Sequence, residues 1–330
     1  MPSAHSTIRV LRPLLILGAL LISSAALAQY PAKPIRVIVP FTPGGSADIS
    51  ARVIGARLAE RLAQPVVVEN HAGGGGILAL ELVKNAPADG YTLGVMANSN
   101  ATKPATMANL PWNLERDFAY IAVTVDATMV LVGNPQRVAA TNLKELTALL
   151  RSGEQKYSYG SCGVASTQHF AMEKYRYYTH AAAVHVPYKG CAVATPDVAS
   201  GHIELALVTL SNALPYLRAG KLRAYGVTTP VRNPAAPDVP TFRESGIPEL
   251  RDYVQEAWYG FGAPAGTPPP IVERLAAEIQ SIVATRDVQE KLRAAGLEPV
   301  FRGPREMAAM MQAEVESFTR LTAAAKITAE

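Results

Sequence analysis

The sequence is poor in charge, in aromatic side chains and in cysteine. Of its 330 residues, 18% are charged and 7% are aromatic, and only two are cysteines. Hydrophobic residues make up 49% of the chain, which is the opposite of the balance that keeps a chain disordered. We therefore expect a globular protein with sizeable cores, long enough for two domains.

Long apolar runs are missing after the first thirty residues, so no membrane span is expected there. The first residues follow the pattern of a signal peptide: Arg9 and Arg12, a short apolar segment, and then the small residues up to Ala28. The apolar segment is shorter than the roughly 20 residues that cross a bilayer. We predict a signal peptide over residues 1–28, cleaved near Ala28/Gln29, and an exported soluble protein.

The sequence also lacks a large excess of charge of one sign. It contains 31 Lys and Arg against 27 Asp and Glu. Removal of Arg9 and Arg12 with the signal peptide leaves 29 against 27, or about +2. This excess is small and scattered, so we do not expect nucleic acid as a partner.

Common catalytic and cofactor motifs are absent. Gly73 and Gly75 give a GxG pattern, but Leu78 occupies the third glycine position of a dinucleotide fingerprint, and no GxxxxGK[ST] or HExxH sequence occurs. We predict no cofactor, no metal site and no enzymatic activity. An exported hydrolase that uses Ser161 and His169 is the alternative, although no third orienting residue is evident. His169 and His185 are also interpreted as structural, hydrogen-bonded histidines.

The chain does contain a repeated pattern of apolar strand, Gly/Ser turn and amphipathic helix. The run 35–39 is a buried strand, and the apolar spacing after Ser46 indicates a helix. The pattern recurs in the middle of the chain, where 157–161, 184–187, 203–208 and 222–228 are expected strands. Such alternation indicates an α/β architecture with parallel crossovers.

Small residues dominate four of the strand-to-helix turns. They are TPGGS (42–46), AGGGG (72–76), GSCGVAST (160–167) and YKGCA (188–192). Turns of this kind lie at the carboxyl edge of a parallel sheet, where helix N-termini offer free amides to an anion. The hydroxyls of Thr42 and Ser46 add donors, and Asp48 is expected to compensate the helix dipole away from the cleft. The alternative is a plain turn in which Ser46 caps its own helix.

Ten ordered blocks resemble the Bug/TctC family, the extracytoplasmic solute receptors of tripartite tricarboxylate transporters. The resemblance runs from Tyr30 to about Thr322. The blocks are YPAKPIRVIVPFTPGG, QPVVVEN, GGGG, ADGYTL, LPW with RDFAYI, YGSCG with His169, VHVPYKG, ALPYLRAGKLRAYGVT, DVPTFRESG and WYGFGAPAGTPP.

The resemblance implies a periplasmic binding protein type II-like fold. It has two doubly wound α/β domains, joined by two crossover strands with a cleft between them. The expected domains are 29–127 plus 256–330, and 128–255. The crossover strands are expected near Met129–Val132 and Trp258–Phe261.

The implied function is capture of a small organic carboxylate in the periplasm for integral-membrane transporter subunits. A membrane sensor is the alternative recipient, and we expect a monomer. The carboxylate is expected to be held by amides, hydroxyls and water at the glycine-rich loops. The expected ligand-binding residues are Phe41, Thr42, Gly44, Gly45, Ser46, Gly75, Gly76, Ser99, Ser161, Cys162, Gly163, Ser166, His169, Tyr188, Lys189, Gly190 and Val208.

Several residues depart from the family pattern. Ile77, Lys103, Thr167 and Gln168 stand where the family has other residues, and Val208 replaces a frequent aspartate. Without that acid, we expect a ligand that has a carboxylate but no amine.

Cys162 and Cys191 also replace small residues of the family, at cleft-facing turns. A disulfide between them and two separate buried thiols are both consistent with the sequence.

Overall fold

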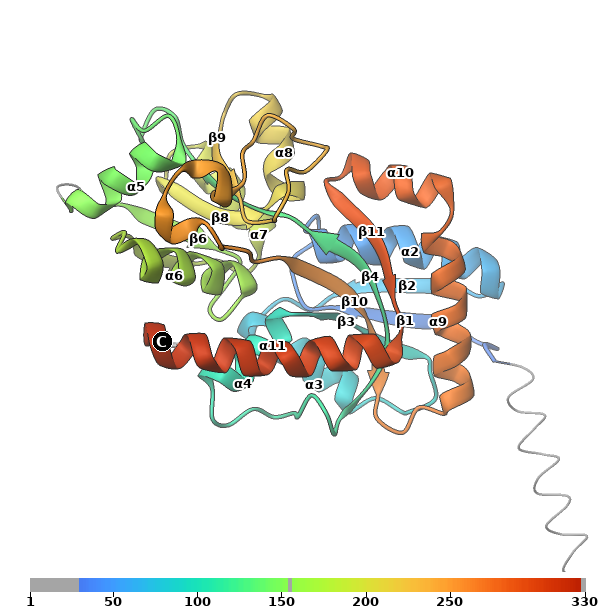
Figure 1. Ribbon diagram of the computed structural model, residues 1–330. Coiled ribbons are helices and arrows are strands. Elements are labelled where there is room, and N and C mark those ends of the chain that lie inside the picture. Colours follow the sequence, from blue (N-terminus) through green and yellow to red (C-terminus); the bar gives the residue numbers. More distant parts are fainter. Residues whose placement is uncertain (1–29, 154–155, 328–330) are drawn as a thin grey trace, which may run out of the picture.

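The computed structural model describes residues 30–153 and 156–327 (Figure 1). The predicted signal peptide and its cleavage site lie outside these residues. Two sheets organise the chain, and we call the part built on each sheet a lobe. Among the described residues, no helix has the length and apolar character needed to cross a membrane.

Lobe 1 is built on a six-stranded mixed sheet with strand order β11-β4-β10-β3-β1-β2. The first strand pairs in parallel with β2 and β3, whereas β10 runs antiparallel to β3 and β4. The strands are β1 (Ile35–Val39), β2 (Val66–Asn70), β3 (Thr92–Ala97), β4 (Phe118–Ala127), β10 (Ala257–Pro264) and β11 (Leu297–Arg302).

Lobe 2 is built on a five-stranded sheet with order β7-β6-β8-β5-β9. Here β6 is parallel to β7 and β8, and β5 is antiparallel to β8 and β9. The strands are β5 (Met129–Gly133), β6 (Ser158–Ser161), β7 (Val184–Pro187), β8 (Leu205–Thr209) and β9 (Arg223–Val227). Both sheets therefore keep the parallel strand-to-helix turns on which the predicted site depends.

Helices cover the sheets of both lobes (Figure 1). Those of lobe 1 are α2 (Ser46–Leu62), α3 (Ile77–Lys84), α4 (Ser99–Thr106), α9 (Pro269–Val283), α10 (Arg286–Ala294) and α11 (Pro304–Ala325). Those of lobe 2 are α5 (Leu143–Ser152), α6 (Thr167–Thr179), α7 (Cys191–Ala199) and α8 (Leu210–Arg218). The long α11 lies along lobe 1 and reaches α6, where the rings of Phe318 and Phe170 are 5.0 Å apart.

Local sequence explains these elements. Four of the five residues of β1 are buried, as expected of a strand covered on both faces. At the start of α5, the Asn142 side chain accepts a hydrogen bond from the Glu145 amide, which satisfies a donor that the helix cannot pair itself. Proline opens α9 and α11, where its missing N–H has no intrahelical partner to lose.

The chain passes between the sheets twice. Thr128 alone separates β4 from β5, and the return leads from β9 through 228–256 to β10. The predicted crossover segments Met129–Val132 and Trp258–Phe261 lie inside β5 and β10, each wholly within one sheet. The crossings themselves therefore come slightly earlier, at Thr128 and before Ala257. The division into domains remains a prediction about which parts move together.

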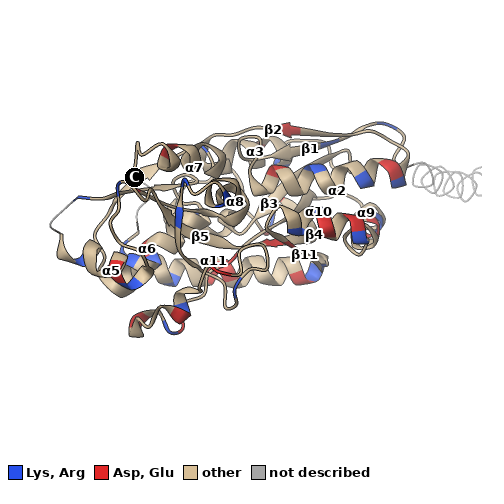
Figure 2. Cartoon of the chain, turned by 90° about the horizontal axis from the view of Figure 1, so that it is seen from above, with Lys and Arg blue, Asp and Glu red and all other residues tan. Residues whose placement is uncertain are grey.

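Basic residues (Lys and Arg) and acidic residues (Asp and Glu) are interspersed along the helices (Figure 2). Many form ion pairs within one element, such as Arg286–Glu290 on α10. Pairs of this exposed kind contribute little to stability. The view from above thus shows mixed charge.

Candidate functional site

Loops from both lobes meet at a common cleft. The β1–α2 and β2–α3 loops of lobe 1 face the β6–α6 and β7–α7 loops of lobe 2. Two adjoining cavities lie between them, and both are lined by Phe41 and Cys162. The predicted glycine-rich turns therefore converge on one place.

The smaller cavity has a volume of about 20 Å³, which is room for one water-sized group. Within it, Thr42 Oγ1 is a buried oxygen for which the described residues offer no hydrogen-bond partner. Its lining residues are Phe41, Thr42, Gly45, Ser46, Ala47, Cys162, Gln168, Cys191, Thr209, Asn212 and Tyr259. A buried hydroxyl without a partner is costly unless something binds it.

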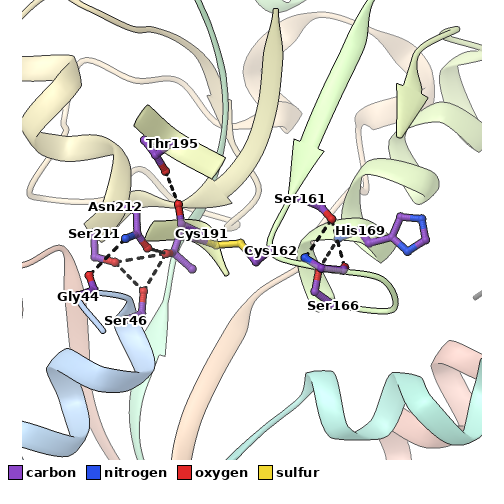
Figure 3. The surroundings of a disulfide bond; sticks show 12 residues. Gly44, Ser46, Ser161, Cys162, Ser166, His169, Cys191, Thr195, Ser211 and Asn212 are labelled. Carbon is purple, nitrogen blue, oxygen red and sulfur yellow. Dashed lines mark hydrogen bonds between the residues drawn. A yellow bond between two sulfur atoms is a disulfide. The ribbon is translucent and has the colours of Figure 1, made fainter. Parts of the chain in front are cut away.

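Ser46 joins the two lobes. Its hydroxyl donates to Thr209 Oγ1 at 2.8 Å and lies 2.5 Å from Ser211 Oγ (Figure 3). Asn212 Nδ2 adds a hydrogen bond of 3.3 Å to the carbonyl of Gly44. Gly45, not Ser46, occupies the N-cap of α2, so the alternative of a capping serine is wrong.

Asp48 braces the first loop, which corrects the expected role in dipole compensation alone. Its carboxylate accepts hydrogen bonds from the Gly44 amide, Arg52 Nε and Asn70 Nδ2, each at 2.9 Å. Burial raises the pKa of this carboxyl, but the bonds from Arg52, Gly44 and Asn70 outweigh burial and lower the pKa overall. Asp48 lies four residues after Gly44, and its carboxylate is directed back toward the β1–α2 loop. The Gly44 amide is therefore already hydrogen-bonded.

The larger cavity has a volume of about 350 Å³, which falls in the range of small-ligand pockets. Its lining residues are Pro40, Phe41, Gly73, Gly74, Gly75, Ile77, Met107, Cys162, Gly163, Val164, Pro187, Tyr188 and Lys189. The Tyr188 hydroxyl donates to Asp197 Oδ2 at 2.8 Å. Because the lining consists mainly of glycine, proline and apolar residues, apolar and backbone groups form most of the wall of this cavity.

Two glycines allow the lobes to approach each other. A β-carbon placed on Gly190, where φ is +151°, would lie 2.7 Å from Thr42 Oγ1 of the other lobe. A β-carbon on Gly75, where φ is +61°, would lie 2.8 Å from Lys103 Nζ and 3.0 Å from the Val164 carbonyl. A β-carbon on Gly190 would therefore displace Thr42 of the other lobe. One on Gly75 would displace the end of Lys103 within lobe 1 and press on the Val164 carbonyl of lobe 2.

Cys162 and Cys191 form a disulfide, and their α-carbons are 4.4 Å apart (Figure 3). The bond links the β6–α6 loop to the first residue of α7. Both cysteines line the smaller cavity. The disulfide therefore fixes the relative positions of two loops that form the cleft.

The pairing of Ser161 with His169 is wrong. Ser161 Oγ lies 2.6 Å from His185 Nε2, because β7 runs parallel beside β6. His169 Nδ1 instead accepts a hydrogen bond from the Ala165 amide at 3.2 Å. Ser161 is completely buried, so it is closed to a substrate in this structure.

The two histidines stack with ring centroids 4.0 Å apart. Burial, with smaller effects of His185, Lys103 and Arg176, lowers the pKa of His169 to about 3. Burial also lowers the pKa of His185 to about 4. Both rings are therefore neutral at physiological pH, and they act as packing and hydrogen-bonding groups.

Several predicted ligand residues line neither cavity. Val208 is buried in lobe 2, where it pairs with Val130, and the adjacent Thr209 reaches the cavity instead. Ser166 caps α6 through the His169 amide. Outside the two linings lie Gly44, Gly76, Ser99, Ser161, Ser166, His169, Gly190 and Val208.

Four polar lining residues and one residue behind the lining are functional candidates that prediction from the sequence missed as site residues. Gln168, Thr209, Asn212 and Tyr259 line the smaller cavity. The sequence marks Gln168 only as a departure from the family pattern. Thr209 and Asn212 lie at a strand-to-helix turn without glycine, so a glycine-rich pattern does not indicate them.

Lys103, the fifth missed residue, crosses from α4 to the β6–α6 loop. It is 1% exposed. Its Nζ donates to the carbonyls of Ala165 at 2.7 Å and Val164 at 3.1 Å. Burial lowers the pKa of its ammonium to about 7.

Two α/β lobes that are joined by two crossings and enclose a cleft define the class of periplasmic binding proteins. The sequence matches the family described as "Tripartite tricarboxylate transporter family receptor", TctC, over residues 50–326. The chain belongs to this family. The predicted recognition and fold class are thereby confirmed.

Curated relatives cover most of the chain. It is 34% identical to the protein BugT of Bordetella pertussis over 294 residues, which is 87% of each chain. It is 32% identical over 299 residues to a protein encoded in the tcbD-tcbE intergenic region of Pseudomonas sp. strain P51, covering 89% of this chain and 87% of that one.

Solved structures of similar proteins superpose on most of this chain. R. palustris Rpa4515 with adipate superposes with a TM-score of 0.86 at 30% identity, over 91% of this chain and 99% of that one. MatC from Rhodopseudomonas palustris with bound malate superposes with a TM-score of 0.82 at 30% identity, over 88% and 99%. The periplasmic binding protein BugD gives 0.85 at 29% identity, over 91% and 99%. The family and these neighbours are binding receptors, not enzymes.

Proposed function

We propose that the protein is a periplasmic receptor that captures a small carboxylate between its lobes and delivers it to a tripartite tricarboxylate-type transporter. The observation that carries the proposal is Thr42 Oγ1, a buried hydroxyl without a partner among the described residues. It lies in the interlobe cavity just before α2. The first amides of a helix have no intrahelical acceptors and carry partial positive charge, so a carboxylate oxygen there is favoured.

The proposed solute would extend through both cavities. The carboxylate would lie in the smaller one, against Thr42, Ser46 and the start of α2. The rest of the solute would occupy the larger cavity. Because the smaller cavity holds only about 20 Å³, the lobes must open to admit the solute, and contacts to both lobes then favour closure.

The proposed solute has a carboxylate and no amine. Among the described residues that line the two cavities, none is aspartate or glutamate, and an ammonium group would find no charged partner there. The names of two structural neighbours include adipate and malate, which supports dicarboxylates as the first acids to test.

The binding test uses thermal unfolding of the chain beginning at Gln29. We expect adipate or malate to raise the melting temperature, since a solute at a hundred times its dissociation constant adds about 2.7 kcal/mol of stability. Aspartate, which carries an ammonium group where malate carries a hydroxyl, should stabilise less than malate. Thr42→Val should weaken binding, whereas Thr319→Val on the exposed face of α11 should not. Stabilisation by aspartate above that by malate would remove the amine-free assignment.

Location and delivery need separate tests in cells. Mass spectrometry of the periplasmic fraction should find a chain that begins at Gln29, and light scattering should give a monomer. Uptake of labelled acid should fall when the gene is deleted and recover with the wild-type chain but not with Thr42→Val. Uptake that continues after deletion would point to delivery elsewhere, such as to a membrane sensor.

A further inference from the structure

Lys103 is a buried cation without an anionic partner. It is 1% exposed, and both of its described hydrogen bonds go to neutral carbonyls, those of Val164 and Ala165. None of the ion pairs among the described residues includes it. A buried charge is normally paired with an opposite charge, because removing it from water is unfavourable.

The ammonium lies directly behind the wall of the larger cavity. A β-carbon on Gly75 would lie 2.8 Å from Lys103 Nζ, and the carbonyl of Val164 accepts its hydrogen bond. Gly75 and Val164 both line the cavity. One layer of backbone therefore separates the charge from a solute in the cavity. Electrostatic interactions remain strong over such a distance when water is excluded.

The surroundings of Lys103 do not neutralise it. From α6, His169 faces it as a neutral ring. On the cavity wall, the charged side chain is Lys189, which has the same sign and is exposed. The lowered pKa of the Lys103 ammonium, about 7, reflects this burial without an opposite charge, and a bound anion would supply that charge.

Resting on the carboxylate-receptor function, we propose that Lys103 makes closure of the lobes depend on the negative charge of the solute in the larger cavity. When the lobes are open, water solvates the ammonium. When they close, the β6–α6 loop covers the ammonium. A solute anion on the cavity side of Gly75 then offsets the lost hydration. A solute with a second carboxylate thus stabilises the closed state more than a neutral analogue of the same shape.

The binding arm compares adipate with adipate monoamide, which has nearly the same shape and one negative charge fewer. Wild-type protein should bind adipate at least about tenfold more tightly by calorimetry, a factor equal to about 1.4 kcal/mol. Lys103→Met should lose most of this preference by binding adipate more weakly. Lys103→Gln removes the charge while keeping a donor, and it should behave in the same way.

The matched control is Lys174→Met. Lys174 is a half-buried lysine that also donates to a backbone carbonyl, that of Val254 at 2.9 Å, but it lines neither cavity. This variant should keep the preference for adipate. An unchanged preference in both Lys103 variants, or an equal loss in Lys174→Met, would overturn the proposal.

A second arm needs no binding. Without an added acid, small-angle scattering should find Lys103→Met more compact than the wild type, because closure no longer buries a charge. Equal radii for the two proteins would overturn the proposal even if adipate does not bind. Failure of every tested acid to bind the wild type would instead remove the proposed function, and the scattering arm would still decide the role of Lys103.

Discussion

Glu314 of α11 is a partly buried acid whose two oxygens differ. Its Oε1 accepts a hydrogen bond of 2.9 Å from Trp258 Nε1 on β10. Its Oε2 is buried, and the described residues offer it no partner. Burial raises the pKa of this carboxyl from 4.5 to about 7, against a smaller lowering by the Trp258 bond. The folded protein therefore holds a proton here that the unfolded chain releases near pH 4.5.

This difference predicts a pH-dependent stability. The favourable contribution is complete below pH 4.5 and is lost as pH rises through 7, because the folded state binds the proton more tightly. Between pH 5 and 8 the loss amounts to about 2–3 kcal/mol. The side chain introduced by Glu314→Gln cannot ionise, so the variant should not show this loss. The difference in free energy of unfolding, variant minus wild type, should therefore increase from pH 5 to pH 8. Urea unfolding followed by tryptophan fluorescence measures both.

Glu316→Gln is the control for this prediction, since Glu316 lies two residues further along α11, is exposed and faces Arg320 at 3.9 Å. Its stability should track the wild type at every pH. Parallel curves for the wild type and Glu314→Gln would show that the carboxyl is ionised in the folded state and would contradict the assignment.

At the scale of single residues, prediction from sequence succeeded where neighbours in sequence also line the site together. Phe41, Thr42, Gly45 and Ser46 were found because one turn carries them all. Tyr259 was not, because its place beside them depends on the antiparallel pairing of β10 with β3, which no local pattern encodes.

Among the elements, the β7–α7 loop lies against the opposite lobe at Gly190. Gly190→Ala would set a β-carbon 2.7 Å from Thr42 Oγ1, so the lobes could not close fully. We expect affinity for adipate to fall at least about tenfold, or about 1.4 kcal/mol. Calorimetry measures this change.

Gly220→Ala is the control that separates backbone strain from the steric contact with Thr42. Gly220 also has positive φ, +66°, but nothing lies within 4 Å of its β-carbon position. The substitution should lower stability by about 1 kcal/mol and leave binding intact. Similar losses of affinity in the two variants would mean that backbone strain, not closure, limits binding.

The disulfide joins two elements of lobe 2 across a sequence separation of 29 residues. Replacing both Cys162 and Cys191 with serine should lower the free energy of unfolding by about 3 kcal/mol, since the unfolded chain regains loop entropy. A reductant should bring the wild type to the value of the double variant in urea unfolding. If the reductant also destabilises the double variant, the loss has another origin.

Element positions were predictable where the apolar period was clear. The strand expected at 184–187 is β7 itself, and the helix expected after Ser46 is α2. Antiparallel β5 and β10 were not distinguished from parallel strands, because both kinds of buried strand have similar apolar runs.

The whole molecule is in a state in which the lobes touch. Ser46 Oγ of lobe 1 is hydrogen-bonded to Thr209 and Ser211 of lobe 2. The cavity behind these hydroxyls has room for about one water molecule. Pattern and resemblance predicted two domains with a cleft. They did not predict how far the cleft is closed, because closure depends on contacts between residues about 165 positions apart.

Locking these contacts tests whether the lobes must separate to admit a solute. Ser46 Oγ and Ser211 Oγ are in hydrogen-bond contact at 2.5 Å, so cysteines at these positions would face each other across the cleft, and we expect oxidation to join them. We expect the oxidised Ser46→Cys/Ser211→Cys chain to take up adipate at least about tenfold more slowly than the oxidised wild type in stopped-flow fluorescence. The reason is that the solute cannot pass the closed contact between the two positions. The single variant Ser46→Cys, oxidised in the same way, should bind at the rate of the wild type. Equal rates in the oxidised double variant and the oxidised wild type would mean that solutes enter without separation of the lobes at Ser46.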